Sequence, residues 1–390
     1  MSQRILVVGA GIAGLAVAAA LQRRGHDVTV LEERPAGAAS GAGISIWPNA
    51  LAALDEIGLG NGVRAAGGRM TAGAVRWRDG TWLRRPDRDR IVTTLGEPLV
   101  IVRRSALTEV LAAGLSPGSI RHGVGVRDLE VTDAGARLQL SDDTAVEADG
   151  VVGADGTYSV VARHLNGPLT HRYVGYTAWR GVANCRIDPD LSGDTMGPGV
   201  EFGHIPMGDR HTYWFVTERA PQGATSPGGE LSYLRGRYSA WADPVPELLG
   251  STDPDLVLRH DLYDRSPVAT WARGAAVLVG DAAHAMRPHL GQGGCQGLED
   301  AAILAAFVNG AESLADAFGK FERYRRPRVE SVVRTSARIG KILNLRPAIL
   351  SALASRATVL LPESVMMGQL ETIASRGAFV VPTHRDVATG

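Results

Sequence analysis

The stretch ILVVGAGIAGLAVAAALQRRGHDVTVLEERP, residues 5–35, decides the fold. Its hydrophobic pattern predicts a buried strand over 5–8, a helix over 12–24 that stops at Gly25, and a second strand over 28–31. Between the first strand and the helix lies GAGIAG, in which Gly9 permits a tight turn, Gly11 admits a pyrophosphate and Gly14 lets helix and strand pack closely. Glu32 ends the second strand, where a carboxylate can hold ribose hydroxyls. The stretch therefore predicts an α/β, Rossmann-like dinucleotide-binding unit.

A second glycine-rich stretch, GDAAHAMRPHLGQGGCQGLEDA (280–301), has the same strand, loop and helix order. AAVLVG (275–280) indicates a buried strand, and the residues after Cys295 have helical spacing, with expected core positions at Leu298, Ile303, Leu304 and Phe307. The glycines of the loop allow close backbone approach, and free amides at a helix start favour a negative or electron-rich group. We expect this loop to face a flat, electron-accepting partner with one polar edge.

The remaining pattern divides the chain into interleaved segments. A strand over 99–102 and a helix over 105–113 are followed by an antiparallel meander over 120–150 and a strand at VVGADG (151–156). Residues 167–260 are rich in β-type runs, and 310–390 are mostly helical. We predict a discontinuous nucleotide-binding domain (1–66, 99–166 and 265–340), a β-rich substrate domain (67–98 and 167–264) and a C-terminal helical segment (341–390).

Composition excludes several other classes of protein. Basic and acidic residues number 41 each, which gives no electrostatic case for nucleic acid or an anionic membrane. Cys185 and Cys295 are the only cysteines, too few for a disulfide framework or a four-thiolate zinc site. The sequence contains no apolar run of about 20 residues, which is the length that a membrane-spanning helix needs. We expect a cytoplasmic protein without a metal, a monomer or a homodimer.

Four motifs, GAGIAG with Glu32, Arg104, GADGTYS (153–159) and GDAAHAMRPHLGQGG, stand in an order that resembles the single-component FAD-dependent aromatic-ring monooxygenases. The resemblance covers about residues 3–340 and is to the p-hydroxybenzoate hydroxylase type, including its short salicylate and urate hydroxylase members. It implies a GR2-type FAD-binding fold, with NADPH or NADH as a transient co-substrate. It also implies insertion of one oxygen atom of O2 into an aromatic or electron-rich small molecule through a flavin C4a-hydroperoxide.

The same resemblance assigns residues to the cofactor. Residues expected to contact FAD are Gly9, Gly11, Ala13, Gly14, Glu32, Glu33, Ser45, Arg104, Val126, Asp155, Asp281, Gly291, Gln292, Gly293, Gly294 and Cys295. Ser45 belongs to GAGISIWPN (41–49), which matches the loop along which the flavin slides. The sequence departs from the family at Ala162, where an arginine implicated in nicotinamide binding is usual. The neighbouring Arg163 is the candidate to replace it.

Residues near the substrate are less sharply indicated. Pro288 is expected to face the reactive side of the flavin. Arg180 and Tyr213 are candidates for catalysis and substrate contact. The alternative for Arg180 is a structural salt bridge, and the alternative for Tyr213 is a place in the hydrophobic core. Glu201 either disfavours anionic substrates from the pocket wall or is an exposed strand residue. His284 and His289 are five residues apart, a poor metal geometry, so hydrogen bonding is expected. Cys295, whose position at a helix start could lower its pKa, is expected to make backbone contacts instead.

Other functions on this fold remain possible at this stage. The chain lacks the Tyr-x-x-x-Lys of short-chain dehydrogenases and the paired-tryptophan stretch of flavin-dependent halogenases. An epoxidase or a dehydrogenase on the same flavin scaffold, or a flavin-binding scaffold without turnover, stays open.

Overall fold

In the computed structural model, which describes residues 2–37, 42–70, 73–309, 311–383 and 386, one sheet carries the N-terminal motif. It has six strands in the order β18-β19-β12-β1-β2-β8, and all neighbours except the β18–β19 pair are parallel. Its strands are β1 (Arg4–Val8), β2 (Asp27–Glu32), β8 (Ile120–His122), β12 (Gly150–Gly153), β18 (Ala272–Arg273) and β19 (Ala276–Leu278).

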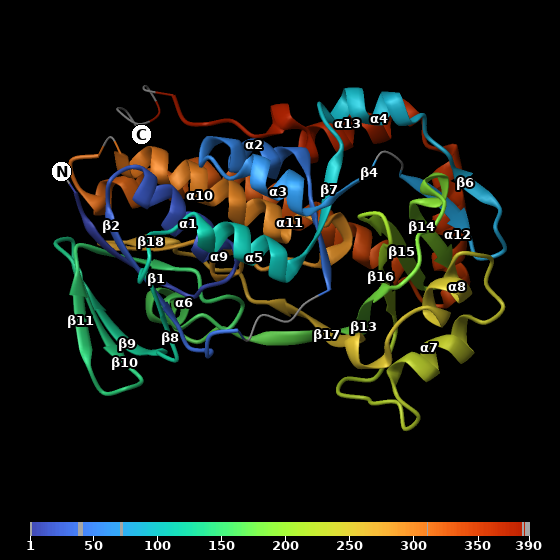
Figure 1. Ribbon diagram of the computed structural model, residues 1–390, viewed down its shortest axis with the longest axis horizontal. Helices are drawn as coiled ribbons and strands as arrows, with labels where there is room; N and C mark the ends of the chain where they lie inside the picture. The colour runs from blue at the N-terminus through green and yellow to red at the C-terminus, as the bar shows by residue number, and fades with distance from the viewer. Residues whose placement is uncertain (1, 38–41, 71–72, 310, 384–385, 387–390) are drawn as a thin grey trace.

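Helices and a small antiparallel sheet cover this parallel sheet (Figure 1). The helices that pack around it are α1 (Ile12–Arg23), α5 (Arg104–Ala113), α6 (Val160–Asn166), α9 (Asp281–His284), α10 (Gly293–Asn309) and α11 (Leu314–Leu343). The small sheet is the meander β9 (Val126–Val131), β10 (Ala136–Leu140) and β11 (Ala145–Ala148). Apolar side chains from all of these elements form one large core.

A second sheet of seven strands lies at the other end of the molecule (Figure 1). In spatial order it contains β17 (Leu258–Arg265), β13 (His171–Ala183), β16 (His211–Glu218), β15 (Val200–Met207), β14 (Gly193–Gly197), β5 (Ala74–Trp77) and β6 (Trp82–Arg84). Helices α7 (Glu230–Tyr238) and α8 (Val245–Gly250) cover one face around a core that includes Trp214 and Phe202. The other face is turned toward the glycine-rich loop at 288–294 and toward the C-terminal helices.

The junction between the two sheets is built from short elements. A three-stranded sheet contains β3 (Gly43–Ile46), β7 (Leu99–Arg103) and β4 (Gly68–Met70), and helices α2 (Pro48–Glu56), α3 (Gly60–Ala66) and α4 (Arg88–Leu95) accompany it. The chain ends in α12 (Ala348–Ala357) and α13 (Glu363–Ala374), and α13 packs against α4. Five short 3-10 turns complete the description: 189–191, 254–256, 288–290, 358–360 and 376–378.

The C-terminal helices bear on the expectation of no membrane span. Among the described residues, a single helix with the length and apolar composition to cross a bilayer does not occur. Ala348–Leu360 and Glu363–Ala374 reach that composition only as a pair, and a bend of 99° separates them.

The elements predicted from local pattern are confirmed, with two differences. The first strand, helix and second strand lie within one residue of their predicted bounds, and Leu298, Ile303, Leu304 and Phe307 are all buried. The meander spans 126–148 rather than 120–150, because β8 instead pairs with β2 in the parallel sheet. Helix α10 begins at Gly293, two residues before Cys295, so its first amides belong to the glycine pair.

The first turn depends on backbone packing that only glycine permits. Gly9 has a φ of +102°, and a Cβ there would lie 2.6 Å from the carbonyl oxygen of Ala154 on the neighbouring strand connection. A Cβ on Gly14 would lie 2.0 Å from the carbonyl oxygen of Gly9. Ala13 in turn fills the space that a side chain at Gly280 or Gly297 would need. The N-terminal motif and the second glycine-rich motif are therefore in direct contact.

Gly14→Ala is expected to lower the free energy of unfolding by about 1–3 kcal/mol or more, because its methyl group meets backbone that cannot rotate away. Urea unfolding followed by circular dichroism measures the change. Gly236→Ala is the matched control, since Gly236 lies in α7 with open space around a Cβ and the substitution favours helix by about 0.5–1 kcal/mol. Equal stability of the two variants would contradict the packing argument.

Candidate functional site

The start of α1 presents unpaired backbone amides beside open space. The first bond within the helix runs from the Leu15 amide to the Gly11 carbonyl, 2.9 Å, so the amides that precede Leu15 have no helical acceptor. A Cβ on Gly11 would have no neighbour within 4 Å, unlike one on Gly9 or Gly14. The close approach predicted at Gly11 is thus physically available, and the helix dipole favours an anionic group there.

Glu32 fixes the same turn from the end of β2. Its carboxylate accepts hydrogen bonds from the Ala10 amide (2.7 Å) and from the Arg34 side chain (2.9 Å), and the residue is 6% exposed. Burial acts to raise the pKa of Glu32, but the Arg34 and Ala10 hydrogen bonds outweigh it and lower that pKa. Glu32 is therefore an ionised acceptor beside the turn, as its predicted role toward a ribose requires.

The second motif presents another set of amides. The first bond within α10 runs from the Gln296 amide to the Gln292 carbonyl, 2.9 Å, which leaves the amides of Gly293, Gly294 and Cys295 without helical acceptors. Gly291 adopts a left-handed conformation (φ +61°), and Asp281 lies next to Gly293 across the mouth of the loop.

Cys295 is a buried thiol rather than a reactive thiolate. Its Sγ lies 3.5 Å from the Ser45 carbonyl and 3.7 Å from the Gly291 carbonyl, and the Trp47 amide points at the sulfur from 3.5 Å. Burial raises the pKa of Cys295 to about 12, opposite to the effect of an exposed helix start. These sulfur contacts join β3 to the glycine-rich loop, and the backbone contact expected between Cys295 and FAD stays a prediction.

Charged groups gather between the two glycine motifs. Burial lowers the pKa of Arg104, and the positive charges of Arg180 and Arg34 lower it further, whereas the negative charge of Asp281 raises it. Asp281, Arg180 and Arg34 therefore all lie close enough to Arg104 to act on its charge. Arg265 donates to the Asp281 carbonyl, 2.6 Å. Four arginines and the Asp281 carboxylate near two sets of free amides make this region suited to a phosphate-bearing ligand.

The other residues predicted for the cofactor lie around this cleft or support it. Asp155 caps α6, accepting from the Val160 amide at 2.7 Å and from the Ser159 hydroxyl, and burial raises its pKa. Val126 begins β9 and is buried. Glu33 lies 3.5 Å from the Cβ position of Gly125, and Ser45 is on β3; Gly41, at the start of GAGISIWPN, falls outside the described residues.

The departure at position 162 has a clear structural setting. Ala162 is fully buried, whereas Arg163 is exposed and donates to the Tyr158 carbonyl, 2.5 Å. An arginine side chain at 162 would therefore have to displace core, while that of Arg163 already lies at the surface beside the GADGTYS motif.

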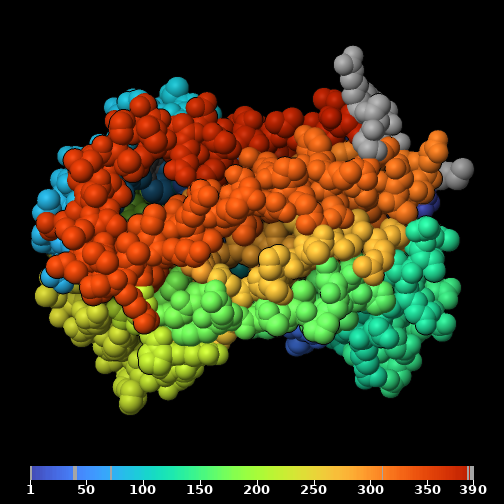
Figure 2. Space-filling model, turned by 180° about the vertical axis from the view of Figure 1, so that it is seen from behind, coloured from blue at the N-terminus to red at the C-terminus, as the bar shows by residue number. Residues whose placement is uncertain are grey.

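A cavity of about 530 Å³ lies between the glycine-rich loop, the seven-stranded sheet and α13. The space-filling view shows a hollow bordered by the orange α11 and the red C-terminal helices, in which blue and green segments are visible (Figure 2). Its wall is mainly apolar, with Leu95, Leu99, Met366, Met367, Leu370 and Ile373 among the contributors. An enclosed, largely apolar space beside a loop of free amides is suited to an organic substrate.

The structure divides the residues predicted for substrate contact. Pro288, at the start of the turn 288–290, and Glu201, on β15, line the cavity. Arg180 and Tyr213 are not part of this lining. Tyr213 is 6% exposed and packs beneath β3, where a Cβ on Gly43 would lie 2.7 Å from the ring, and it neighbours Arg180. β3 covers the Tyr213 ring, and Arg180 lies close enough to Arg104 to lower its pKa. This placement favours the cofactor side for both residues.

One cavity residue, Asp194, was not singled out from the sequence, and a second, His289, had only a structural expectation. Asp194, on β14, lines the cavity and lies close enough to Glu201 for its charge to act on the Asp194 pKa. The fully buried His289 side chain connects Glu201 Oε2 (3.0 Å from Nδ1) to the Tyr176 hydroxyl (2.9 Å from Nε2). His289 and His284 thus make the hydrogen bonds expected of them, and no cluster of metal-type side chains occurs in the described part of the chain.

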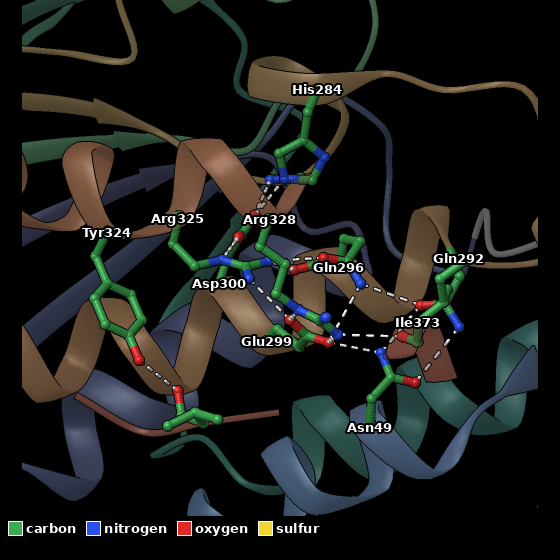
Figure 3. Close-up of polar contacts among 12 residues, drawn as sticks. Asn49, His284, Gln292, Gln296, Glu299, Asp300, Tyr324, Arg325, Arg328 and Ile373 are labelled. Carbon is green, nitrogen blue, oxygen red and sulfur yellow. Dashed lines mark hydrogen bonds and ion pairs between the residues drawn. The ribbon is translucent and has the colours of Figure 1, made fainter. Parts of the chain in front are cut away.

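A buried ionic network holds the glycine-rich loop in place (Figure 3). Arg325 of α11 donates to Glu299 and to Asp300 on α10, each at 2.8 Å, and all three side chains are within 1% of complete burial. Asp300 also accepts from the Gly280 amide (2.9 Å) and pairs with His284 (2.6 Å). Burial would raise the pKa of Asp300, but the His284 and Arg325 charges hold it at about 2.

The network reaches the loop itself through amide side chains. Asn49 donates to Glu299 (2.6 Å) and to Gln292 (3.0 Å), and Gln292 also accepts from Gln296 (3.1 Å) (Figure 3). Gln292 is 1% exposed, so its side chain belongs to the core and only its backbone remains for a ligand. Nothing in the local sequence separates Arg325 from the surface arginines of RYRRPR, which is why the network was not predicted.

The comparisons with known proteins agree with this geometry. A family model described as FAD binding domain matches residues 2–336. The chain is 35% identical to aurachin C monooxygenase/isomerase of Stigmatella aurantiaca, over 87% of this chain and 89% of that protein. It is 35% identical to 3-amino-4-hydroxybenzoate 2-monooxygenase of Streptomyces cremeus, over 88% of each. Plant zeaxanthin epoxidases also match, and this chain spans about half of their length.

Solved structures show the same arrangement. The crystal structure of Klebsiella pneumoniae HpxO complexed with FAD and uric acid superposes with a TM-score of 0.88 at 26% identity, covering 95% of this chain and 96% of that one.

Arg325→Met is expected to destabilise the protein by about 3–5 kcal/mol, because it leaves Glu299 and Asp300 buried with fewer cationic partners. Urea unfolding measures the loss. Arg334→Met is the matched control on the same helix, where the exposed pair with Glu330 contributes within about 0.5 kcal/mol. A loss below about 1 kcal/mol for Arg325→Met would show that the network is not needed for stability.

Proposed function

From the premise that this chain belongs to the FAD binding domain family and is an FAD-dependent monooxygenase, we propose that it uses NADPH or NADH to insert one oxygen atom of O2 into an aromatic or other electron-rich small molecule. The observation that carries the proposal is the apolar cavity that reaches Gly291 and Gln292, directly before the free amides of Gly293 and Gly294. The segments 1–66, 99–166 and 265–340 would hold the cofactor, and 67–98 with 167–264 would shape the substrate cavity.

The residues present fit FAD at both ends of the cleft. The open space at Gly11 and the free amides of α1 suit its pyrophosphate, and Glu32 is an ionised acceptor for the adenosine ribose. Asp281 and Arg104 flank the path between the two glycine motifs, where the ribityl chain would lie. The amides at the start of α10 suit the polar edge of the ring system.

When bound, FAD accepts electrons from the reduced nicotinamide and activates O2, so that one oxygen atom enters the substrate and the other leaves as water. The chain contributes position and environment. The α10 amides and helix dipole stabilise negative charge on the reduced ring. The apolar cavity wall excludes water from the reaction, and Pro288 holds the substrate side of the loop in one conformation. Epoxidation of an alkene would use the same arrangement and is the alternative reaction. The apolar wall of the cavity favours this alternative because it suits an alkene substrate.

Purified protein is expected to be yellow, and its NADPH or NADH oxidation to rise when a turnover substrate is added from a panel of phenols, aromatic acids, indoles and polyene lipids. Under ¹⁸O2, mass spectrometry should find one labelled oxygen per product molecule. Protein that stays folded but takes up no FAD, or that oxidises NADPH without any labelled product across the panel, would contradict the proposal.

Gly11→Ala is expected to reduce FAD affinity by roughly tenfold or more, because the added methyl group occupies the space proposed for the pyrophosphate. Its unfolding free energy without FAD should match the wild type, since no protein atom lies within 4 Å of the Cβ position. Fluorescence titration of the FAD-free protein measures the affinity, and Gly236→Ala again serves as the control. Unchanged FAD affinity would remove Gly11 from the binding site.

Arg163→Ala is expected to raise the KM for NADPH or NADH several-fold and to leave FAD content unchanged, because Arg163 is an exposed cation beside the GADGTYS motif. Steady-state kinetics at saturating O2 measures the effect. Arg127→Ala, an exposed arginine on the meander, is the control. An unaltered KM would show that the chain holds the nicotinamide cofactor elsewhere.

A further inference from the structure

We propose that Asp194 and Glu201 together recognise an O–H or N–H group of the substrate, and that the cavity takes an amphiphilic molecule whose donor-bearing ring lies at this pair and whose apolar body lies against α13. The inference rests on the proposed function, because it takes the cavity as the place of oxygen transfer. It adds the substrate class and the residues that select it.

Strand register places both carboxylates on the cavity face of the seven-stranded sheet. Asp194 on β14 pairs with Gly203 on β15, and Met196 pairs with Glu201, so the two carboxylates stand on one face in adjacent rows. The residues between them, Thr195 and Phe202, point to the opposite face. There Thr195 bonds to the buried His204 at 2.9 Å. The cavity face therefore carries two acidic side chains that no motif requires.

Both carboxylates keep acceptor capacity directed at the cavity. Among the described residues, no hydrogen-bond donor reaches the Asp194 carboxylate, although protein surrounds it and its remaining open surface faces the cavity. Glu201 is 8% exposed and uses Oε2 for His289, while Oε1 has no donor among the same residues. An enclosed acceptor without a donor is costly unless a ligand supplies one.

The arginines that also line the cavity do not neutralise this pair. Arg84 donates to the carbonyls of Thr358 and Leu361, and Arg85 pairs with Asp190 at 3.2 Å. One terminal nitrogen of each guanidinium is thus engaged by a protein group, and neither arginine is paired with Asp194 or Glu201 among the described residues. Burial and the Glu201 charge raise the pKa of Asp194 to about 8, which favours the protonated form of Asp194 at neutral pH. Such a pair accepts from a neutral donor and repels a carboxylate.

His289 and Tyr176 act as positioning residues for Glu201. Burial raises the pKa of Tyr176 to about 12, so its hydroxyl stays protonated and donates to His289 Nε2, while Nδ1–H donates to Glu201. Gly340 of α11 packs against the His289 ring, because a Cβ there would lie 2.6 Å from ring atoms. The orientation of Glu201 is thus set by β13, by the turn 288–290 and by α11.

The opposite end of the cavity is apolar and belongs mainly to α13 and α4. Met366, Met367, Leu370 and Ile373 face it from α13, and Ile91 and Leu95 from α4. Flexible methionine side chains adapt to an elongated apolar group. A volume of about 530 Å³ exceeds what a single aromatic ring fills, so the ring at the carboxylates is expected to carry an apolar extension.

The test uses FAD-loaded protein and three probes that share an octyl-substituted benzene ring: 4-octylphenol, which donates a hydrogen bond, 4-octylanisole, in which the donor is capped, and 4-octylbenzoate, an anion. Perturbation of the flavin absorbance gives each Kd at pH 7. 4-Octylphenol is expected to bind at least tenfold more tightly than either of the other probes, the size of a hydrogen bond to a charged acceptor.

Two variants connect the preference to the pair. In Glu201→Gln the ratio of benzoate to phenol Kd is expected to fall at least fivefold, and in Asp194→Asn/Glu201→Gln it is expected to approach 1. Tyr176→Phe should lower the ratio by a smaller factor, because it removes only the hydroxyl that orients His289. Asp209→Asn, an exposed charge on the same sheet's turn, is the matched control and should leave the ratio unchanged.

The outcomes separate the inference from the proposed function. Folded protein that binds no FAD sinks the proposed function. FAD-loaded wild-type protein that binds the three probes with equal Kd, or binds none, overturns only the inference, whatever the folding of the variants. A preference that survives in the double variant overturns the assignment to Asp194 and Glu201.

Discussion

The contact on which the rest of the structure depends is the buried Arg325 guanidinium between Glu299 and Asp300. Burying these charges costs several kcal/mol per ion unless the geometry satisfies each one. Here the other hydrogen bonds come from the His284 ring, the Gly280 amide, Asn49, Gln296 and Arg328. The partners come from α2, α9, α10 and α11, so these elements can pack together only in the arrangement that also aims the α10 amides at the cleft.

This constraint explains how two distant glycine motifs form one site. Ala13 of α1 packs against Gly280 and Gly297, and a larger residue at either glycine would push α1 away from α10. The two helix starts are therefore held at fixed positions, with their free amides available before any ligand arrives. Donors fixed in this way need no reorganisation when a phosphate or an anionic ring edge binds, which is the condition for strong electrostatic stabilisation.

The sequence was informative where structure is local. The βαβ unit, the strand before Asp281 and the buried positions of α10 follow from periodicity and from glycine spacing within about 30 residues. The cavity wall does not, because it depends on strand register and on how β3 crosses the sheet. Arg180 and Tyr213 were each predicted either to face the substrate or to be structural; neither lines the cavity, and β3 covers Tyr213. Asp194 stands in the unremarkable run GDTMG, and only the tertiary fold brings it into the same cavity as α13.

The same division bears on how such a scaffold can serve different substrates. The cofactor side consists of backbone amides, glycines and a buried ionic network, and few substitutions there leave packing intact. The cavity side consists of alternate residues on β14 and β15 together with one face of α13, where side chains project into open space. A change from a neutral to an acidic residue on that face alters which substrate is held without disturbing the helix starts. The Asp194–Glu201 pair lies on this cavity face, and the raised pKa of Asp194 lowers the electrostatic cost of holding two carboxyl groups so close together.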